Sequence, residues 1–285
     1  MVFTLEFPRI LRYNNRKVFT TAQEKEAVMI RVTIYNEFAQ EQLNKRTFPF
    51  QESWGEESIR LMSERADEIA AAHEGGAIHD TLKALVSECE DVEVRHIATL
   101  EMPEHGLTEE VLADTDVLIW WSHLAQEAVS DEVAHRVRDH VQRGMGAIFL
   151  HSAHMCKPMR ELLGTSCTLR WREGDSEHLW CCNPTHPIAK GVPVCIWLEQ
   201  EEMYGEYFDI PKPDELIFIG GFGGGEVFRS GCVWNRGYGK VFYFQPGHET
   251  YRSYFNPDIR RVIQNAVHYV ADPEMRLTTL DCLPV

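Results

Sequence analysis

The chain has 285 residues, of which 44% are hydrophobic and 25% are charged, and its formal net charge is −16. This length and composition are typical of a globular protein with room for a substantial core. The negative charge disfavours a polyanionic partner such as nucleic acid. No apolar run in the sequence approaches the roughly 20 residues of a membrane span, so we expect no membrane partner.

The chain has 8 cysteines, which are spread along the sequence without a CxxC pair. This distribution predicts free thiols in a reducing cytoplasm rather than a disulfide framework. Cys181 and Cys182 are adjacent, and a bridge between neighbouring residues would be strained. No early stretch has the features of a secretory signal, so we predict a cytoplasmic protein.

The domain organisation predicted from the sequence is simple. Residues 1–28 have weak periodicity and are expected to form a flexible N-terminal arm. A single α/β domain is predicted over 29–272, followed by a C-terminal tail over 273–285.

The polar stretch 37–55 is too long for a tight connection between a strand and a helix. It contains Phe48, Phe50 and Trp54 among polar residues. We therefore expect it to close over a pocket or to contact a neighbouring subunit.

Strands and helices alternate in the first half of the predicted domain. The strands are expected at 29–36, 92–99, 116–121 and 146–150, and the helices at 75–88, 107–115 and 130–144. Thr108 and Ser130 are suitable N-caps, and Gly144 is a suitable helix stop. This alternation predicts a parallel sheet that is covered by helices on both faces.

After about residue 165 the pattern becomes richer in strands. Strands are expected within 167–183, 193–208, 214–235 and 239–249. The glycine-rich segment 220–228 is followed by a strand rather than a helix, so a hairpin turn explains it better than a phosphate-binding loop. The apolar spacing of 257–271 predicts a closing amphipathic helix.

Three of the predicted strands end in histidine. His123 follows one, His151 and His154 follow the next, and His248 with Glu249 follows a late strand. Ligands gather at the carboxyl ends of parallel strands, and neutral imidazoles serve as metal ligands and general bases. The sequence therefore predicts a histidine-rich site at this edge of the sheet.

The segment "IFLHSAHMC" predicts a sharp turn after a buried strand, but no obvious nucleophile. Ser152 lacks the flanking glycines of a G-x-S-x-G elbow. His151, His154 and Cys156 lack the spacing and internal glutamate of a helical zinc motif. Cys156 is expected to be an ordinary buried thiol at the start of the next helix.

An acidic and aromatic segment, "EQEEMYGEYF", occupies residues 199–208. We expect most of its glutamates to be solvated, with one facing the site. Aromatic residues near these strands would suit either a sugar ring or the core; they are Trp120, Trp121, Tyr204, Tyr207, Trp234, Tyr251 and Tyr254.

The order and spacing of four segments resemble the ThuA-like (trehalose utilisation) family. These are "GAIFLHSAH", "THPIAKGVP", "EEMYGEYF" and "VWNRGYGKVFYFQPGHE", and the resemblance extends from Met29 to Ala271. It implies a flavodoxin-like, class I glutamine amidotransferase-like three-layer sandwich with a mostly parallel central sheet and a β-rich C-terminal part. In that fold His151 would occupy the elbow position at which amidotransferases keep a cysteine, and His248 would match their later histidine. Imidazole cannot form the acyl-thioester, so glutaminase activity is not expected.

The resemblance implies an enzyme that acts on a disaccharide or a keto-sugar derivative. The candidate catalytic residues are His151, His248, Glu249 and Ser152, and the candidate ligands of a divalent transition metal such as zinc are His151, His248, His123 and Glu202. No nucleotide cofactor is expected, and the chain is expected to form a homo-oligomer. The alternatives are a metal-dependent hydrolase of a non-sugar substrate and a non-catalytic module that binds a sugar or a partner.

Overall fold

The structure, a computed structural model, describes residues 29–45, 56–274 and 276–280. The predicted arm over 1–28 lies outside the described residues, as do Phe48, Phe50 and Trp54 of the expected loop. Residues Gln40–Lys45 at the start of that loop form a short 3-10 helix, η1. No helix in the described part of the chain is long and apolar enough to cross a membrane.

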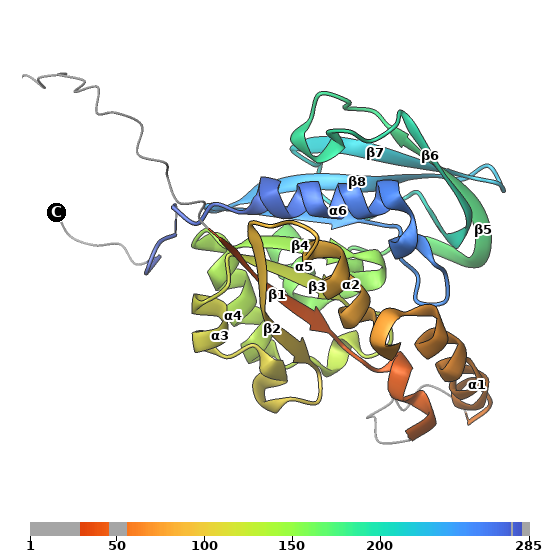
Figure 1. The fold of residues 1–285 in the computed structure, drawn as a ribbon, viewed down its shortest axis with the longest axis horizontal. Helices are drawn as coiled ribbons and strands as arrows, with labels where there is room; N and C mark the ends of the chain where they lie inside the picture. Colours follow the sequence, from red (N-terminus) through yellow and green to blue (C-terminus); the bar gives the residue numbers. More distant parts are fainter. Residues whose placement is uncertain (1–28, 46–55, 275, 281–285) are drawn as a thin grey trace, which may run out of the picture.

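A nine-stranded sheet organises the molecule, with the strand order β2-β1-β3-β4-β9-β8-β7-β5-β6 (Figure 1). Strands β2, β1, β3, β4 and β9 pair in parallel, and the remaining pairs are antiparallel. The strand bounds are β1 Ile30–Asn36, β2 Val92–Thr99, β3 Val117–Trp121, β4 Gly146–Leu150, β5 Arg170–Cys181, β6 Cys195–Gly205, β7 Glu215–Phe222, β8 Val227–Arg236 and β9 Gly239–Phe244. The predicted parallel core followed by a β-rich part is therefore confirmed.

Helices cover both faces of the sheet. Their bounds are α1 Glu56–Ala72, α2 Ile78–Val86, α3 Glu109–Ala113, α4 Asp131–Gln142, α5 Lys157–Leu163 and α6 Pro257–Val270. Apolar residues of α3, α4 and α5 join one buried cluster, and those of α2 and α6 join the other. The structure thus has the predicted three layers.

Strands β3 and β4 show why the centre of the sheet needs both layers. All residues of both strands are buried. Trp120 and Phe149 point into one cluster, whereas Ile119 and Ile148 point into the other. Continuous apolar strands of this kind are typical of a sheet covered on both faces.

The helix ends mostly follow the sequence, with two differences. The hydroxyls of Thr108 and Ser130 accept hydrogen bonds from the third residue along, which confirms both caps. The helix expected from residue 75 begins only at Ile78, because Gly75 has a φ of 66° that does not continue a helix. Helix α1 was not expected from the sequence; Ala66 and Ile69 are buried among its described side chains.

Candidate functional site

The turn after β4 is a sharp elbow centred on His151. The strand ends at Leu150, and the 3-10 helix His151–Met155 (η5) begins at once. His151 has a φ of 54°, a left-handed conformation that is uncommon for a residue with a side chain and costs about 1–3 kcal/mol. Strained backbone of this kind is often found where a functional side chain must be held at the edge of a sheet.

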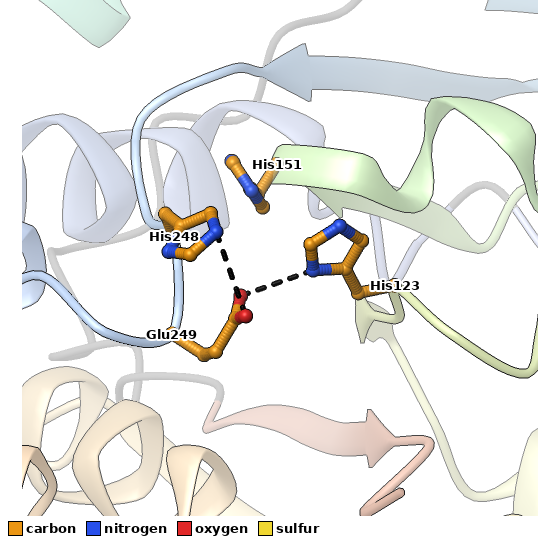
Figure 2. A group of neighbouring side chains, drawn as sticks. All are labelled: His123, His151, His248 and Glu249. Carbon is orange, nitrogen blue, oxygen red and sulfur yellow. Dashed lines mark hydrogen bonds and ion pairs between the residues drawn. The ribbon is translucent and has the colours of Figure 1, made fainter. Parts of the chain in front are cut away.

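Three imidazoles converge at the carboxyl ends of three neighbouring strands (Figure 2). His123 follows β3, His151 follows β4, and His248 follows β9. The ring centroids of His123 and His151 are 5.5 Å apart, those of His123 and His248 are 5.5 Å apart, and those of His151 and His248 are 5.1 Å apart. The structure therefore brings together the three histidines that the strand-end rule selected.

Glu249 lies between two of these rings, as Figure 2 shows. Its Oε2 is 3.0 Å from His123 Nδ1, and its Oε1 is 3.5 Å from His248 Nε2. The side chain is buried. One carboxylate thus orients two imidazoles.

Glu202 approaches the cluster from strand β6. Its Oε2 lies 3.1 Å from Nε2 of the fully buried His151. The neighbouring Tyr204 stacks against His151, and its hydroxyl is 2.8 Å from Ser152 Oγ and 3.5 Å from His151 Nε2. Ser152 therefore contacts the site through Tyr204.

The expectation that most glutamates of this segment are solvated was wrong. Glu201 and Glu202 are both buried, and Glu206 forms an ion pair with Arg229. Only Glu199 is fully on the surface. Strand β6 lies at the edge of the sheet, yet its C-terminal half is covered by the loops that carry the histidines.

Hydrogen bonds fix the tautomers of two histidines. His151 Nδ1–H donates to the carbonyl oxygen of Gln245 at 3.0 Å, which leaves the lone pair of a neutral ring on Nε2. His248 Nδ1 accepts the backbone N–H of Thr250 at 3.2 Å, so a neutral His248 carries its proton on Nε2. The Thr250 hydroxyl, 2.8 Å from the same nitrogen, accepts a hydrogen bond from Arg65.

Two further buried carboxylates hold the histidine loops from behind. Glu37, directly after β1, accepts the backbone N–H groups of Leu124 and Ala125. Glu201 accepts the backbone N–H groups of Gly247 at 3.0 Å and His248 at 3.1 Å. Neither residue was predicted for this role from the sequence, because their hydrogen-bond partners lie far away in the chain.

Gly247 is required in the second of these loops. It has a φ of 131°, and a Cβ atom at this position would lie 2.1 Å from the hydroxyl of Tyr254. Only glycine fits such a conformation and such a close approach. The glycine of the "PGHE" segment therefore allows His248 and Glu249 to reach the cluster.

The cluster separates the pKa values of chemically identical groups. Burial alone would lower the pKa of His123, but the negative charge of Glu249 raises it to about 9. Burial lowers the pKa of His248 to about 4 despite the same carboxylate. Burial would raise the pKa of Glu202, but its hydrogen bond to His151 and its electrostatic attraction to the three imidazoles lower this pKa to about 2. At neutral pH the site thus holds a charged His123 beside a neutral His248.

A cavity of about 690 Å³ opens onto this cluster. Its lining includes His123, His248, Glu249, Glu202, Tyr204 and Ser152, together with Gln40, Arg65, Gln126, Trp171 and Glu173. His151 lies beneath the cavity, behind Glu202 and Tyr204. A small molecule could therefore meet the carboxylates and two of the imidazoles directly.

Cys156, His154 and most of the candidate aromatic residues do not belong to the cluster of imidazoles and carboxylates. Cys156 is fully buried in the core, and burial raises the pKa of its thiol well above the ordinary range, as expected for an unreactive cysteine. His154 lines the cavity, but its Nδ1–H is bonded to the carbonyl oxygen of Cys167. Most of the aromatic residues that suited either a sugar or the core are core residues, namely Trp120, Trp121, Trp234 and Tyr254.

Four groups in the described part of the chain could hold a metal ion. One donor atom each from His123, His151, His248 and Glu249 lies within 4.8 Å of the others. The free Nε2 lone pair of His151 fits such a role, whereas His248 fits only if it gives up its hydrogen bond from Thr250. Glu202, which was also predicted as a ligand from the sequence, is not in this compact set.

The sequence matches the family model of ThuA, described as trehalose utilisation, over residues 61–270. No curated protein matches the chain. Two similar solved structures are ThuA-like proteins. The one from Parabacteroides merdae has a TM-score of 0.59 and 12% identity, covering 88% of this chain and 92% of that one. The one from Bacteroides uniformis has a TM-score of 0.54 and 14% identity, covering 88% and 95%.

A cytoplasmic protein from Salmonella typhimurium is also similar, with a TM-score of 0.50 and 13% identity, covering 67% of this chain and 86% of that one. At these identities the solved structures bear on the fold alone.

Proposed function

The chain belongs to the ThuA family, and from this premise we propose that it is an enzyme that processes a disaccharide or a keto-sugar derivative. The observation that carries the proposal is the cluster of three imidazoles and two carboxylates beside one cavity, in which the pKa values of His123 and His248 are moved apart. Groups whose environments separate their pKa values in this way are suited to acid and base roles.

The proposed chemistry is removal of a proton from the carbon beside a sugar carbonyl. Such a step needs a base at the C–H bond and a hydrogen-bond donor at the carbonyl oxygen. Glu202 and His151 supply the base, because Glu202 Oε2 lies 3.1 Å from His151 Nε2 and Glu202 faces the cavity. The charged His123 supplies a donor for the developing oxyanion through its Nε2–H, because Glu249 contacts its Nδ1 and orients this ring together with that of His248.

The same groups can serve an elimination that releases a second sugar. After the C–H proton has moved to the base, the electron pair of the enolate expels the glycosyl oxygen from the neighbouring carbon. An imidazolium then gives that oxygen its proton. Net charge and atoms balance without an added oxidant or reductant.

A divalent transition metal such as zinc is a second way to provide the electrophile. The compact donor set of His123, His151, His248 and Glu249 favours it. Bound there, a metal would polarise the carbonyl oxygen as a Lewis acid. Elemental analysis after purification without chelator, with metal supplied, tests this version; essentially no bound metal would remove it and leave the acid–base version in place.

The direct test of the proposed function is NMR in deuterated water with a panel of disaccharides and their oxidised keto forms. We expect the wild-type protein to exchange the hydrogen beside the carbonyl of a keto-sugar or to cleave its glycosidic bond. His151→Asn and His248→Gln should remove this activity while the fold is kept. Asparagine is chosen at 151 because it tolerates the left-handed conformation.

His135→Gln is the matched control, because His135 is an exposed residue of α4 that does not line the cavity. Full activity of both site variants would contradict the proposal. Turnover of non-sugar esters or amides alone would favour the general hydrolase, and sugar binding without exchange or cleavage would favour a binding module.

We also propose that the protein works in the cytoplasm as a homo-oligomer, with a small carbohydrate rather than nucleic acid or a membrane as its ligand. The described cysteines are all free, and the similar Salmonella typhimurium protein is cytoplasmic. Cell fractionation and light scattering of the purified protein test these two points.

A further inference from the structure

One aromatic side chain at the cavity has no role in the chemistry above. Trp171 lies on β5 directly opposite Tyr204 of β6. Directly paired residues of antiparallel strands project from the same face of the sheet. Trp171 therefore lies beside Tyr204, one strand inward from the edge strand β6, and both residues line the cavity.

The exposure of these two aromatic residues differs sharply. Tyr204 is 2% exposed and packs against His151, whereas Trp171 is 64% exposed. Among the large apolar side chains that are exposed in the described part of the chain, only Trp171 lines this cavity. An indole ring in this position offers an apolar surface to whatever enters the cavity.

Polar groups accompany the ring at the same wall. Arg65 of α1 forms an ion pair of 2.9 Å with Glu173, which lies two residues after Trp171 on β5. The hydroxyl of Tyr251 is 3.3 Å from the other oxygen of Glu173. Arg65 also donates a hydrogen bond to Thr250, which contacts His248. Hydrogen bonds therefore connect this wall to the loop that carries His248.

An exposed aromatic ring flanked by fixed hydrogen-bonding groups matches the chemistry of a pyranose. One face of a sugar ring presents C–H groups that pack on an aromatic surface, and its hydroxyls need charged or polar partners at the edge. The cavity is also larger than one sugar ring beside the His–Glu cluster would fill.

We propose that Trp171, with Arg65 and Glu173, forms a subsite for a second sugar ring, so that the ligand is a glycoside of at least two rings. The first ring lies at the histidines, and the second stacks on Trp171. This inference rests on the proposed function for the assignment of a sugar to the cavity, but it concerns binding rather than catalysis.

The test compares binding of trehalose, maltose and cellobiose with binding of glucose, by calorimetry and saturation-transfer NMR. We expect at least one disaccharide to bind the wild-type protein about tenfold more tightly than glucose, and Trp171→Ala to remove about that factor. Trp171→Phe should retain most of the affinity, because it keeps a ring. Glucose binding should be unchanged in both variants.

Trp197→Ala is the matched control, because Trp197 is also exposed, at 51%, but does not line this cavity. The proposal is overturned if no disaccharide binds more tightly than glucose, if Trp171→Ala binds disaccharides like the wild type, or if it weakens glucose equally. The two proposals fail separately: His151→Asn should abolish exchange without weakening disaccharide binding, whereas Trp171→Ala should leave exchange of a one-ring keto-sugar intact.

Discussion

His151 Nε2 lies 3.1 Å from Glu202 Oε2, and this carboxylate oxygen has no hydrogen-bond donor in the described residues if His151 is neutral. Because His151 already donates its Nδ1–H to Gln245, a neutral ring would place two lone pairs face to face. A proton or a cation between the two atoms would remove this repulsion. Acid–base chemistry requires a proton at this pair, whereas metal chemistry requires a cation there.

Glu202→Gln tests this pair. The amide is not a base, and its N–H would donate to His151 and hold that ring neutral. We expect turnover of a keto-sugar to fall by about 10²–10⁴-fold while the thermal melting curve changes little. Glu199→Gln is the control, since Glu199 is an exposed residue on the same strand. Equal turnover of the two variants would argue against Glu202 as part of the base.

The rate should depend on pH through His123. Its pKa is raised to about 9, so it stays charged at neutral pH and loses its proton above about pH 9. We expect kcat/KM to fall on that alkaline side. Glu249→Gln removes the charge that raises this pKa, so the alkaline limit should move toward the ordinary value of 6.5. An alkaline limit that stays in place in this variant would show that another group sets it.

Stability should fall in acid because of His248. Its pKa is lowered from 6.5 to about 4 in the folded state, so the unfolded chain binds a proton more readily between these values. The free energy of unfolding therefore decreases as the pH falls from about 6.5 to about 4. The decrease is on the order of 3 kcal/mol if this group acts alone. Urea titrations at several pH values should show a weaker acid dependence in His248→Gln than in the wild type.

The two carboxylates behind the histidine loops should matter for both stability and rate. Glu37→Ala leaves the N–H groups of Leu124 and Ala125 without an acceptor, and Glu201→Ala does the same to Gly247 and His248. Each unpaired buried N–H costs about 1–3 kcal/mol. We expect a lower melting temperature and, at temperatures at which the variants are folded, a lower kcat with little change in binding of a disaccharide.

The milder variants Glu37→Gln and Glu201→Gln keep one acceptor oxygen and should recover part of the loss. Glu199→Ala again serves as the control. Unchanged kcat in a destabilised Glu201→Ala would mean that this residue supports the fold without positioning His248.

Cys156→Ala should leave turnover unchanged. Its thiol is fully buried, and its raised pKa keeps it protonated. We expect a modest loss of stability, about 1 kcal/mol, from the small void in the core. Loss of activity in a variant that retains its fold would reopen the question of a cysteine nucleophile near the elbow.

Several parts of the site were predictable from local sequence. The buried runs of β3 and β4 located the ends of these strands, and Thr108 and Ser130 located the starts of helices α3 and α4, because all of these are short-range signals. Parallel strands end at one edge, so His123, His151 and His248 could be expected to converge. The requirement for glycine at position 247 depends on its close approach to Tyr254, which is not visible in the sequence.

The contacts between these parts were decided by tertiary structure. Glu201 and Glu202 look like solvated charges in the sequence. In the structure Glu201 accepts a hydrogen bond from the backbone of the His248 loop, and Glu202 lies beside His151. The reason is that the antiparallel strand β6 runs back to the place where the parallel strands end. Arg65 and Trp171 reach the cavity from α1 and β5 through packing that no local pattern encodes. The sequence by itself determined which side chains stand at the strand ends. Only the packing of distant strands decided their partners and charge states, since both depend on distances between residues far apart in the chain.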